Sequence, residues 1–421
     1  MSIPGPDDIQ RYTLPNGIVV LVRENFTSPA VVVRGYLPAG ACYERPEQAG
    51  LAAFTADAVA RGTAKRTFAH IYEEVESVGA SFGVSSGVHT TGFGGKSLAE
   101  DLPLVLDVLA DVLRFPTFPG DEVARLQGEI ITALEERAHN TSAMANLAFY
   151  ELAYPMEHPY ARSVSGYIET VRKITPSDLA EFHATRYTPQ GMVIVVVGAV
   201  KSDEALERIG QAFGDWEGPA PQPVDWPQVP KITEVRERFV PIHGKMQADI
   251  VLGYPGPARS SPDYLDAVVC NTILGVFGLM GRLGDTVRDS QGLAYYSYSR
   301  LDGGLGPGPW RIVAGVHPTN VERAVAGFRA EIRRIREQPV DEVELAENKS
   351  FITGSLPLRL ETNEGVAGAI VNMERYGLGL DYLQRYAALI AEIDAKRVQE
   401  VARRWLDPDA YALAVAGPPS D

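Results

Sequence analysis

Residues 174–198 read ITPSDLAEFHATRYTPQGMVIVVVG, and residues 393–417 read IDAKRVQEVARRWLDPDAYALAVAG. Each stretch begins with a capped amphipathic helix, continues through a proline turn and ends in an apolar strand closed by glycine. The isoleucine, proline and glycine recur at one shared offset of 219 residues. Similarity at a fixed offset is the mark of an internal repeat, so we expect a duplicated chain.

The beginnings of the two halves extend this repeat. Residues 17–22 and 30–36 in the first half, and 248–254 in the second, have the apolar composition of β-strands, and long helical patterns follow them. Strands followed by helices are typical of an α+β fold. We therefore predict two homologous α+β halves, each an antiparallel or mixed β-sheet with helices packed on one face.

A proline-rich segment separates the halves. Residues 216–230 read WEGPAPQPVDWPQVP, and five prolines in this length exclude a helix or a central strand. The sequence thus predicts an N-terminal domain at residues 1–215, a linker at 216–232 and a C-terminal domain at 233–421.

The composition narrows the possible partners and locations. The 421 residues carry a net charge of −15, which repels a phosphate backbone and makes nucleic acid an unsuitable partner. Cys42 and Cys270 are the only cysteines, which fits a reducing compartment. The longest apolar run, at 192–200, is far shorter than the ~20 residues that a membrane span needs, and residues 1–10 resemble neither a secretory signal nor a transit peptide. We expect a cytoplasmic protein without a membrane partner.

Three segments resemble one known family. They are TLPNGIVVLVRENFTSPAVVVRGYLPAG at 13–40, AGLAAFTADAVARGTAKRT at 49–67 and GLMGRLGDTVRDSQGLAYYSYS at 278–299. Together they resemble the pitrilysin and mitochondrial-processing-peptidase family of zinc peptidases, and the resemblance continues to the end of the chain. It implies the processing-peptidase-like fold, in which two similar halves follow one another.

The zinc motif of that family is altered here. The family carries H-x-x-E-H on a helix, with two histidines holding zinc and the glutamate acting as general base. Ala53, Ala56 and Asp57 occupy these positions, and the family's third ligand, a glutamate, falls at 132–134, beginning with Thr132. The seven histidines include no pair at helical i, i+4 spacing, so a different metal site stays a weaker alternative. We expect this chain to bind no metal and its 51–61 helix to serve the fold.

A second part of the family motif is present. The resemblance assigns to Arg288 and Tyr295 the arginine and tyrosine that reach towards the zinc site in the family. A phenolic O–H can stabilise the oxyanion that forms during peptide hydrolysis, and a guanidinium can hold substrate carbonyls. From residue type alone, Arg288 also fits a solvated cation at a helix end, and Tyr295 a packed strand residue.

These features imply a non-catalytic subunit of a heterodimeric zinc peptidase. Its expected partner is a homologous zinc-binding subunit that holds the zinc, its expected substrate is a peptide or an unfolded protein, and the chain alone would be inactive. A structural or peptide-binding protein of the same fold is the alternative, and an autonomous peptidase is disfavoured by the missing ligands. Residues 81–93 resemble a strand whose open edge receives substrate in the family. The stretch GVFGLMG at 275–281 is shorter than the glycine-rich loop of the zinc-less mitochondrial subunit, which argues against presequence recognition.

Overall fold

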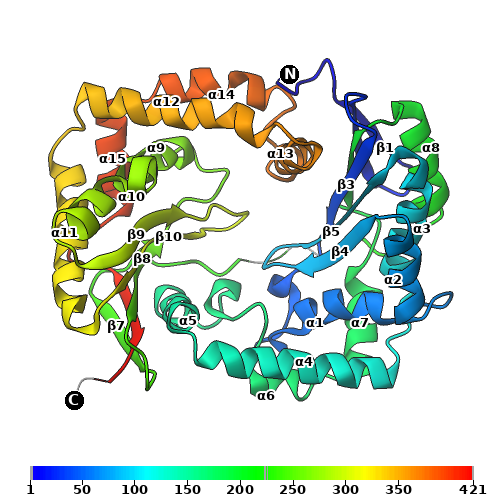
Figure 1. The fold of residues 1–421 in the computed structure, drawn as a ribbon, viewed down its shortest axis with the longest axis horizontal. Coiled ribbons are helices and arrows are strands. Elements are labelled where there is room, and N and C mark those ends of the chain that lie inside the picture. The colour runs from blue at the N-terminus through cyan, green and yellow to red at the C-terminus, as the bar shows by residue number, and fades with distance from the viewer. Residues whose placement is uncertain (1–2, 222–223, 225, 420–421) are drawn as a thin grey trace. The chain divides into compact units, whose positions relative to one another are not determined.

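The computed structural model describes residues 3–221, 224 and 226–419. The chain forms two compact units, each built from separate segments of the sequence (Figure 1). The first unit comprises Met1–Leu134, Ser163–Asp225 and Pro357–Gln384, and the second comprises Glu135–Arg162, Trp226–Leu356 and Arg385–Asp421.

The first unit contains a six-stranded mixed sheet in the order β1-β2-β6-β3-β5-β4. Its strands are β1 (Gln10–Thr13), β2 (Val19–Glu24), β3 (Ala30–Leu37), β4 (Ser81–Ser86), β5 (Thr91–Leu98) and β6 (Val193–Gly198). Only β2 and β6 among them run parallel to each other. The sequence VIVVVG makes β6 apolar on both faces, and all six of its residues are buried between helical layers.

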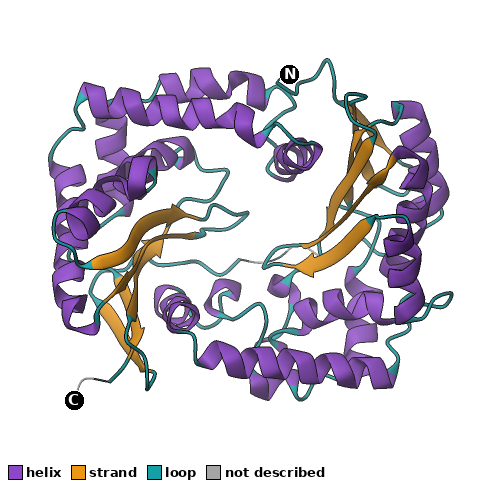
Figure 2. Ribbon diagram, viewed as in Figure 1, coloured by secondary structure: helices purple, strands orange, loops and turns teal. Residues whose placement is uncertain are grey.

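Most helices of the first unit cover one face of this sheet (Figure 2). They are α1 (Leu51–Ala58), α2 (Phe68–Ser77), α3 (Leu102–Arg114), α4 (Gly120–Ala138), α6 (Ile168–Val171), α7 (Pro176–Arg186) and α8 (Ser202–Phe213). Apolar residues spaced along α3 face β5 and β4, which closes the core on that side.

The second unit has a five-stranded sheet in the order β7-β11-β8-β10-β9. Its strands are β7 (Arg236–Pro241), β8 (Ala248–Pro255), β9 (Ala294–Leu301), β10 (Pro309–Val316) and β11 (Ala412–Gly417). When β7 is matched to β2, this order equals β2-β6-β3-β5-β4 of the first sheet, and the one parallel pair also corresponds. The predicted α+β duplication is therefore confirmed.

The helices of the second unit repeat those of the first. They are α9 (Tyr264–Gly275), α10 (Phe277–Leu283) with a π-helical turn at Gly284–Asp289, α11 (Val321–Glu337), α12 (Glu342–Arg359), α14 (Tyr382–Ala391) and α15 (Ala395–Trp405). In the described part of the chain, no helix combines the length and the apolar character that crossing a bilayer requires.

Two equivalent helices are exchanged between the halves of the sequence. Helix α5 (Thr141–Ala153) comes from the first half but packs on β7, β8 and β11 of the second unit. Helix α13 (Asn363–Arg375) comes from the second half but packs on β3 and β6 of the first unit, on the face opposite α3. The compact units therefore differ from the continuous domains 1–215 and 233–421 that the sequence suggested. The two units divide between Asp225 and Trp226, inside the expected linker, of which residues 222, 223 and 225 lie outside the described residues.

Candidate functional site

Helix α1, which carries the altered zinc motif, is held at its N-terminus by a buried carboxylate. The N–H of Gly50 donates to Glu44 Oε2 at 3.1 Å, and the N–H of Ala52 donates to Glu44 Oε1 at 2.5 Å. Gly50 has a φ of 98°, a left-handed conformation that favours glycine. A carboxylate at a helix N-terminus satisfies unpaired N–H groups and interacts favourably with the helix dipole. The helix is thus fixed in place by groups outside the altered motif.

The side chains at the motif positions cannot form a zinc site. Ala56 is buried, Ala53 is half-buried, and both present only methyl groups. Asp57 lies one turn after Ala53 on an exposed part of the helix. Desolvation by the surrounding protein raises the pKa of the Asp57 carboxyl, and the nearby Arg61 opposes that effect. One carboxylate remains where the family has two imidazoles and a general base.

The expected third position lies on α4 and is also unsuited to a metal. Thr132 is exposed, and its hydroxyl donates to the carbonyl of Gly128 at 3.0 Å within the helix. On the same helix, the carboxylate of Glu129 forms an ion pair with Arg61 at 2.5 Å. Arg61 also lies over the ring of Phe68, 4.8 Å from its centroid. An arginine therefore neutralises Glu129.

Zinc does not fit this set of donors. Stable zinc sites use three or four imidazole, thiolate or carboxylate ligands, and the motif positions Ala53, Ala56, Asp57 and Thr132 supply one carboxylate. Throughout the residues that the structure describes, no group of three His, Cys, Asp or Glu side chains is placed to hold a metal. Two of the histidines have structural surroundings instead: His183 Nε2 lies 2.9 Å from the carbonyl oxygen of Leu113, and His158 packs against the ring of Tyr160.

Arg288 lies in the π-helical turn that ends α10. Its side chain is about one-third exposed, and its Nη1 lies 3.9 Å from Asp289 Oδ1, which is a weak ion pair. That Nη1 is buried and makes no hydrogen bond with any described residue. Single π-helical turns occur often at functional sites because they re-aim side chains that a regular helix would place elsewhere. The guanidinium of Arg288 can therefore donate a hydrogen bond to a ligand.

Tyr295 lies at an irregular position near the start of β9. In the pairing of β9 with β10, Gly315 lies opposite Tyr296 and Val316 opposite Ala294, so Tyr295 is the extra residue of a β-bulge. Bulges turn a side chain away from the regular alternation of the strand. The side chain of Tyr295 is 65% exposed, so burial of its ring does not account for the residue. The π-helical turn with Arg288 contacts β9, so both residues belong to the same local structure of the second unit.

The segment at 81–93 forms a hairpin, which corrects the expected single strand. Residues 87–90 make a turn in which the N–H of Gly87 donates to the carbonyl of Thr90 at 2.9 Å, and the chain then returns as β5. Strand β4 pairs only with β5 among the described strands and forms the edge of the sheet. An edge strand carries unpaired backbone groups to which an extended peptide can add.

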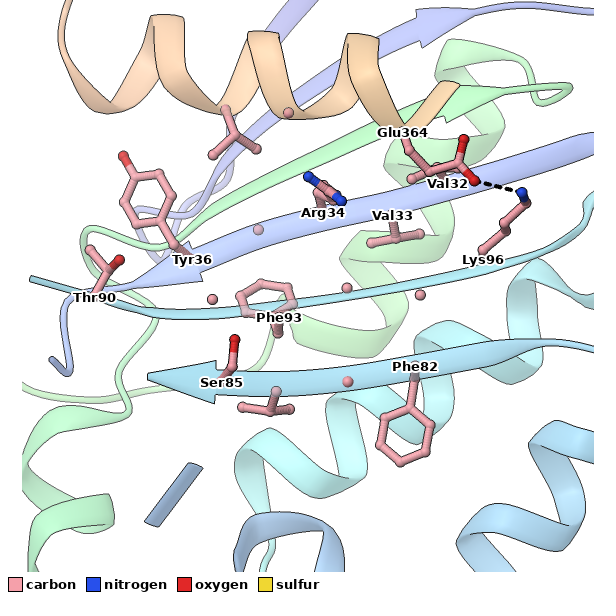
Figure 3. Close-up of a pocket in the computed structure, with 18 of the residues that line it drawn as sticks. Val32, Val33, Arg34, Tyr36, Phe82, Ser85, Thr90, Phe93, Lys96 and Glu364 are labelled. Atoms are coloured by element: carbon pink, nitrogen blue, oxygen red, sulfur yellow. Dashed lines mark ion pairs between the residues drawn. The ribbon is translucent and has the colours of Figure 1, made fainter. Parts of the chain in front are cut away.

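The sequence analysis did not predict a groove that lies on the face of this sheet covered by α13. It has a volume of about 690 Å³ and lies between α13 and strands β3, β4 and β5, all within the first unit (Figure 3). Its charged lining residues are Arg34, Lys96, Glu364 and Arg375. Arg34 and Lys96 lie on strands of the sheet, whereas Glu364 and Arg375 lie far along the chain in α13, so no local pattern predicts that these four residues line one groove.

Comparison with known proteins relates the whole chain to one peptidase family. Residues 19–164 match the family model described as insulinase, peptidase family M16, and residues 173–351 match the model described as the peptidase M16 inactive domain. An uncharacterized zinc protease of Streptomyces coelicolor is 28% identical over 99% of this chain and 91% of its own length. The probable mitochondrial-processing peptidase subunit beta of Arabidopsis thaliana is 23% identical over 97% of this chain and 78% of its own length.

Solved structures agree with this assignment. The crystal structure of a peptidase M16 inactive domain from Pseudomonas fluorescens is 26% identical, with a TM-score of 0.89 over 98% of this chain and 99% of that one. A protease from Helicobacter pylori has the same fold, with a TM-score of 0.90 at 20% identity over 97% of this chain and 99% of that one. The chain therefore belongs to the M16 peptidase family, as a member whose zinc-motif positions hold Ala53, Ala56 and Asp57.

Proposed function

We propose that this chain is the non-catalytic subunit of a heterodimeric zinc peptidase, with a homologous zinc-binding chain as its partner. The observation that carries the proposal is the contrast between the two parts of the family motif. Ala53, Ala56 and Asp57 supply a single carboxylate, which is too few donors for zinc. Arg288, in contrast, has a guanidinium Nη1 without a hydrogen bond to any described residue, and the side chain of Tyr295 is exposed. Such a division is useful only if another chain contributes the metal.

The chemistry assigned to this chain is substrate binding and charge stabilisation. A zinc ion on the partner would polarise the scissile carbonyl and activate water. The phenolic O–H of Tyr295 donates a hydrogen bond to the oxygen that becomes negative in the transition state. The guanidinium of Arg288 donates to substrate carbonyls and so orients the peptide. The open edge of β4 offers backbone groups to an extended substrate.

A cytoplasmic location belongs to the same proposal. Cys270 is a buried free thiol, a state that reducing compartments maintain. Both chains, the partner as well as this one, determine which peptide or unfolded protein the pair cleaves.

Reconstitution tests the proposal. The chain is mixed with a family member that has an intact H-x-x-E-H motif, and cleavage of a peptide library is measured for each chain alone and for the mixture. We expect activity only in the mixture. Arg288→Ala should raise KM, because it removes donors to the bound peptide, whereas the control Arg323→Ala removes an exposed arginine of α11 and should change nothing. Activity that is unchanged by Arg288→Ala in a folded complex would favour the alternative of a binding or structural protein.

A further inference from the structure

Several residues on the floor of the groove in the first unit are glycines, which leave the backbone of the strands uncovered. Across β3, β5 and β4 the register aligns Arg34 with Gly94 and Gly83. Two residues further along, it aligns Tyr36 with Gly92 and Ser85. Glycine in the middle of a strand weakens it and often marks a place where a ligand or another backbone approaches closely.

The glycines of the floor are not all explained by packing. A Cβ built on Gly83 would meet no atom within 4 Å, and one on Gly92 would only reach carbonyl oxygens at 3.8 Å. Neither residue has a positive φ, so the backbone conformation does not demand glycine there. The space above these two residues is therefore open for a ligand.

The charges of the groove are arranged along its length. At one end Lys96 forms an ion pair with Glu364 of α13 at 2.5 Å, and Thr90 lies at the other end (Figure 3). Arg375 of α13 donates a hydrogen bond to the hydroxyl of Thr90. Arg34 lies between the two ends and has no hydrogen bond or ion pair with any described residue. Its Nη1 lies 3.1 Å from where a Cβ of Gly368 would be, so this glycine makes room for the guanidinium beneath α13.

This arrangement indicates a ligand with one anionic group on a larger, uncharged body. Three cations and one carboxylate line the groove in a chain whose net charge is −15, so the groove is basic against its background. Lys96 and Arg375 already have partners, which leaves Arg34 to bind an anion. The volume of about 690 Å³ far exceeds that of a small anion, since one water occupies ~30 Å³ of liquid. A free inorganic ion would leave most of the glycine floor uncovered.

We propose that this groove binds an extended peptide segment that carries an acidic side chain, with the carboxylate at Arg34 and the main chain over Gly83 and Gly92. A guanidinium binds a carboxylate through two parallel hydrogen bonds, and the bare strands accept a backbone at close approach. The inference rests on the proposed function, because it names acidic segments as the class of substrate that this subunit selects. It makes Arg34 a specificity residue of the chain itself.

The test measures direct binding to the full chain without partner or zinc. Heptapeptides blocked at both ends, with glutamate, glutamine or lysine at the centre and an uncharged dye, are titrated by fluorescence polarisation. We expect the glutamate peptide to bind about five- to tenfold more tightly than the glutamine peptide, as for a partly exposed charged hydrogen bond. Arg34→Gln should abolish this preference, and Arg34→Glu should transfer it to the lysine peptide. Arg172→Gln, which removes an exposed arginine outside the groove, should leave it intact.

Two further measurements make the result decisive. Gly83→Val, at a position where an added Cβ meets no atom within 4 Å, should weaken all three peptides by filling the floor, while a melting curve confirms folding. Inorganic phosphate should fail to displace the glutamate peptide at equal concentration. Equal affinities for the three peptides, or displacement by phosphate alone, would overturn the inference. Because no activity is measured, this inference can fail while the reconstitution assay of the proposed function succeeds, and the reverse also holds.

Discussion

Replacing Glu44 by alanine should destabilise the first unit substantially. Glu44 is 7% exposed, and its carboxylate accepts hydrogen bonds from the N–H groups of Gly50 and Ala52 at the start of α1. Hydrogen bonds to a charged group contribute about 1.5–3 kcal/mol each, but alanine also removes the cost of burying the carboxylate. We therefore expect the free energy of unfolding to fall by about 2–3 kcal/mol. This figure includes the cost of leaving the N–H groups at the start of α1 without an acceptor.

The assay is thermal unfolding of the full chain, followed by circular dichroism. For a unit of about 200 residues, such a loss lowers Tm by roughly 5–10 °C. Glu47→Ala is the matched control, because this exposed glutamate lies three residues away, and its Tm should stay within about 1 °C of the wild type. If Glu44→Ala unfolds at the same temperature as Glu47→Ala, the carboxylate does not hold α1, and the structural role assigned to this helix is wrong.

Three other predictions address the metal, the pH dependence and the exchanged helix. The purified chain should contain no stoichiometric zinc, because Ala53 and Ala56 offer no donors; elemental analysis that finds one tightly held zinc per chain would contradict this. Burial, with a smaller effect of Arg162, lowers the pKa of His158 from 6.5 to about 4. As pH falls, the imidazole of His158 is therefore protonated in the unfolded chain before it is protonated in the folded chain. The stability it contributes is complete above pH 6.5 and is lost as pH falls towards 4, so Tm should fall less over this window in His158→Gln than in the wild type. Asn363 Oδ1 accepts from Asn25 at 2.7 Å, and Asn363→Ala should cost about 1–3 kcal/mol in denaturant unfolding; no change would mean that α13 is not anchored there.

The repeat in the sequence was sufficient to predict the two similar sheets. Residues 174–198 and 393–417 form the same helix and strand in each half, and β6 and β11 take the same place in their sheets. The exchange of α5 and α13 was not predictable, because the two helices are equivalent in the repeat and both sheets offer the same surface. Local pattern specifies that a helix packs on such a sheet but not on which copy.

The site was predictable to a similar extent. The positions of Ala53, Ala56 and Asp57 on one helix, and of Arg288 and Tyr295 near a helix end and a strand start, followed from the resemblance to the peptidase family. The ion pair of Arg61 with Glu129 depends on the packing of α4 and could not be derived from spacing. The groove around Arg34 likewise depends on α13, which reaches the first unit from more than 300 residues further along the chain.

The kcat of the reconstituted pair with Tyr295→Phe tests most directly whether this chain contributes to a zinc site on its partner. Phenylalanine keeps the ring on the bulge of β9 and deletes only the hydroxyl, and Tyr298→Phe on the same strand is the control. Loss of one oxyanion donor lowers kcat by roughly 10²- to 10³-fold, while KM should change little because the oxyanion exists only in the transition state. We expect this loss for Tyr295→Phe and none for Tyr298→Phe. A kcat within about twofold of the wild type in a folded Tyr295→Phe complex would contradict this expectation, since single oxyanion donors contribute far more than that.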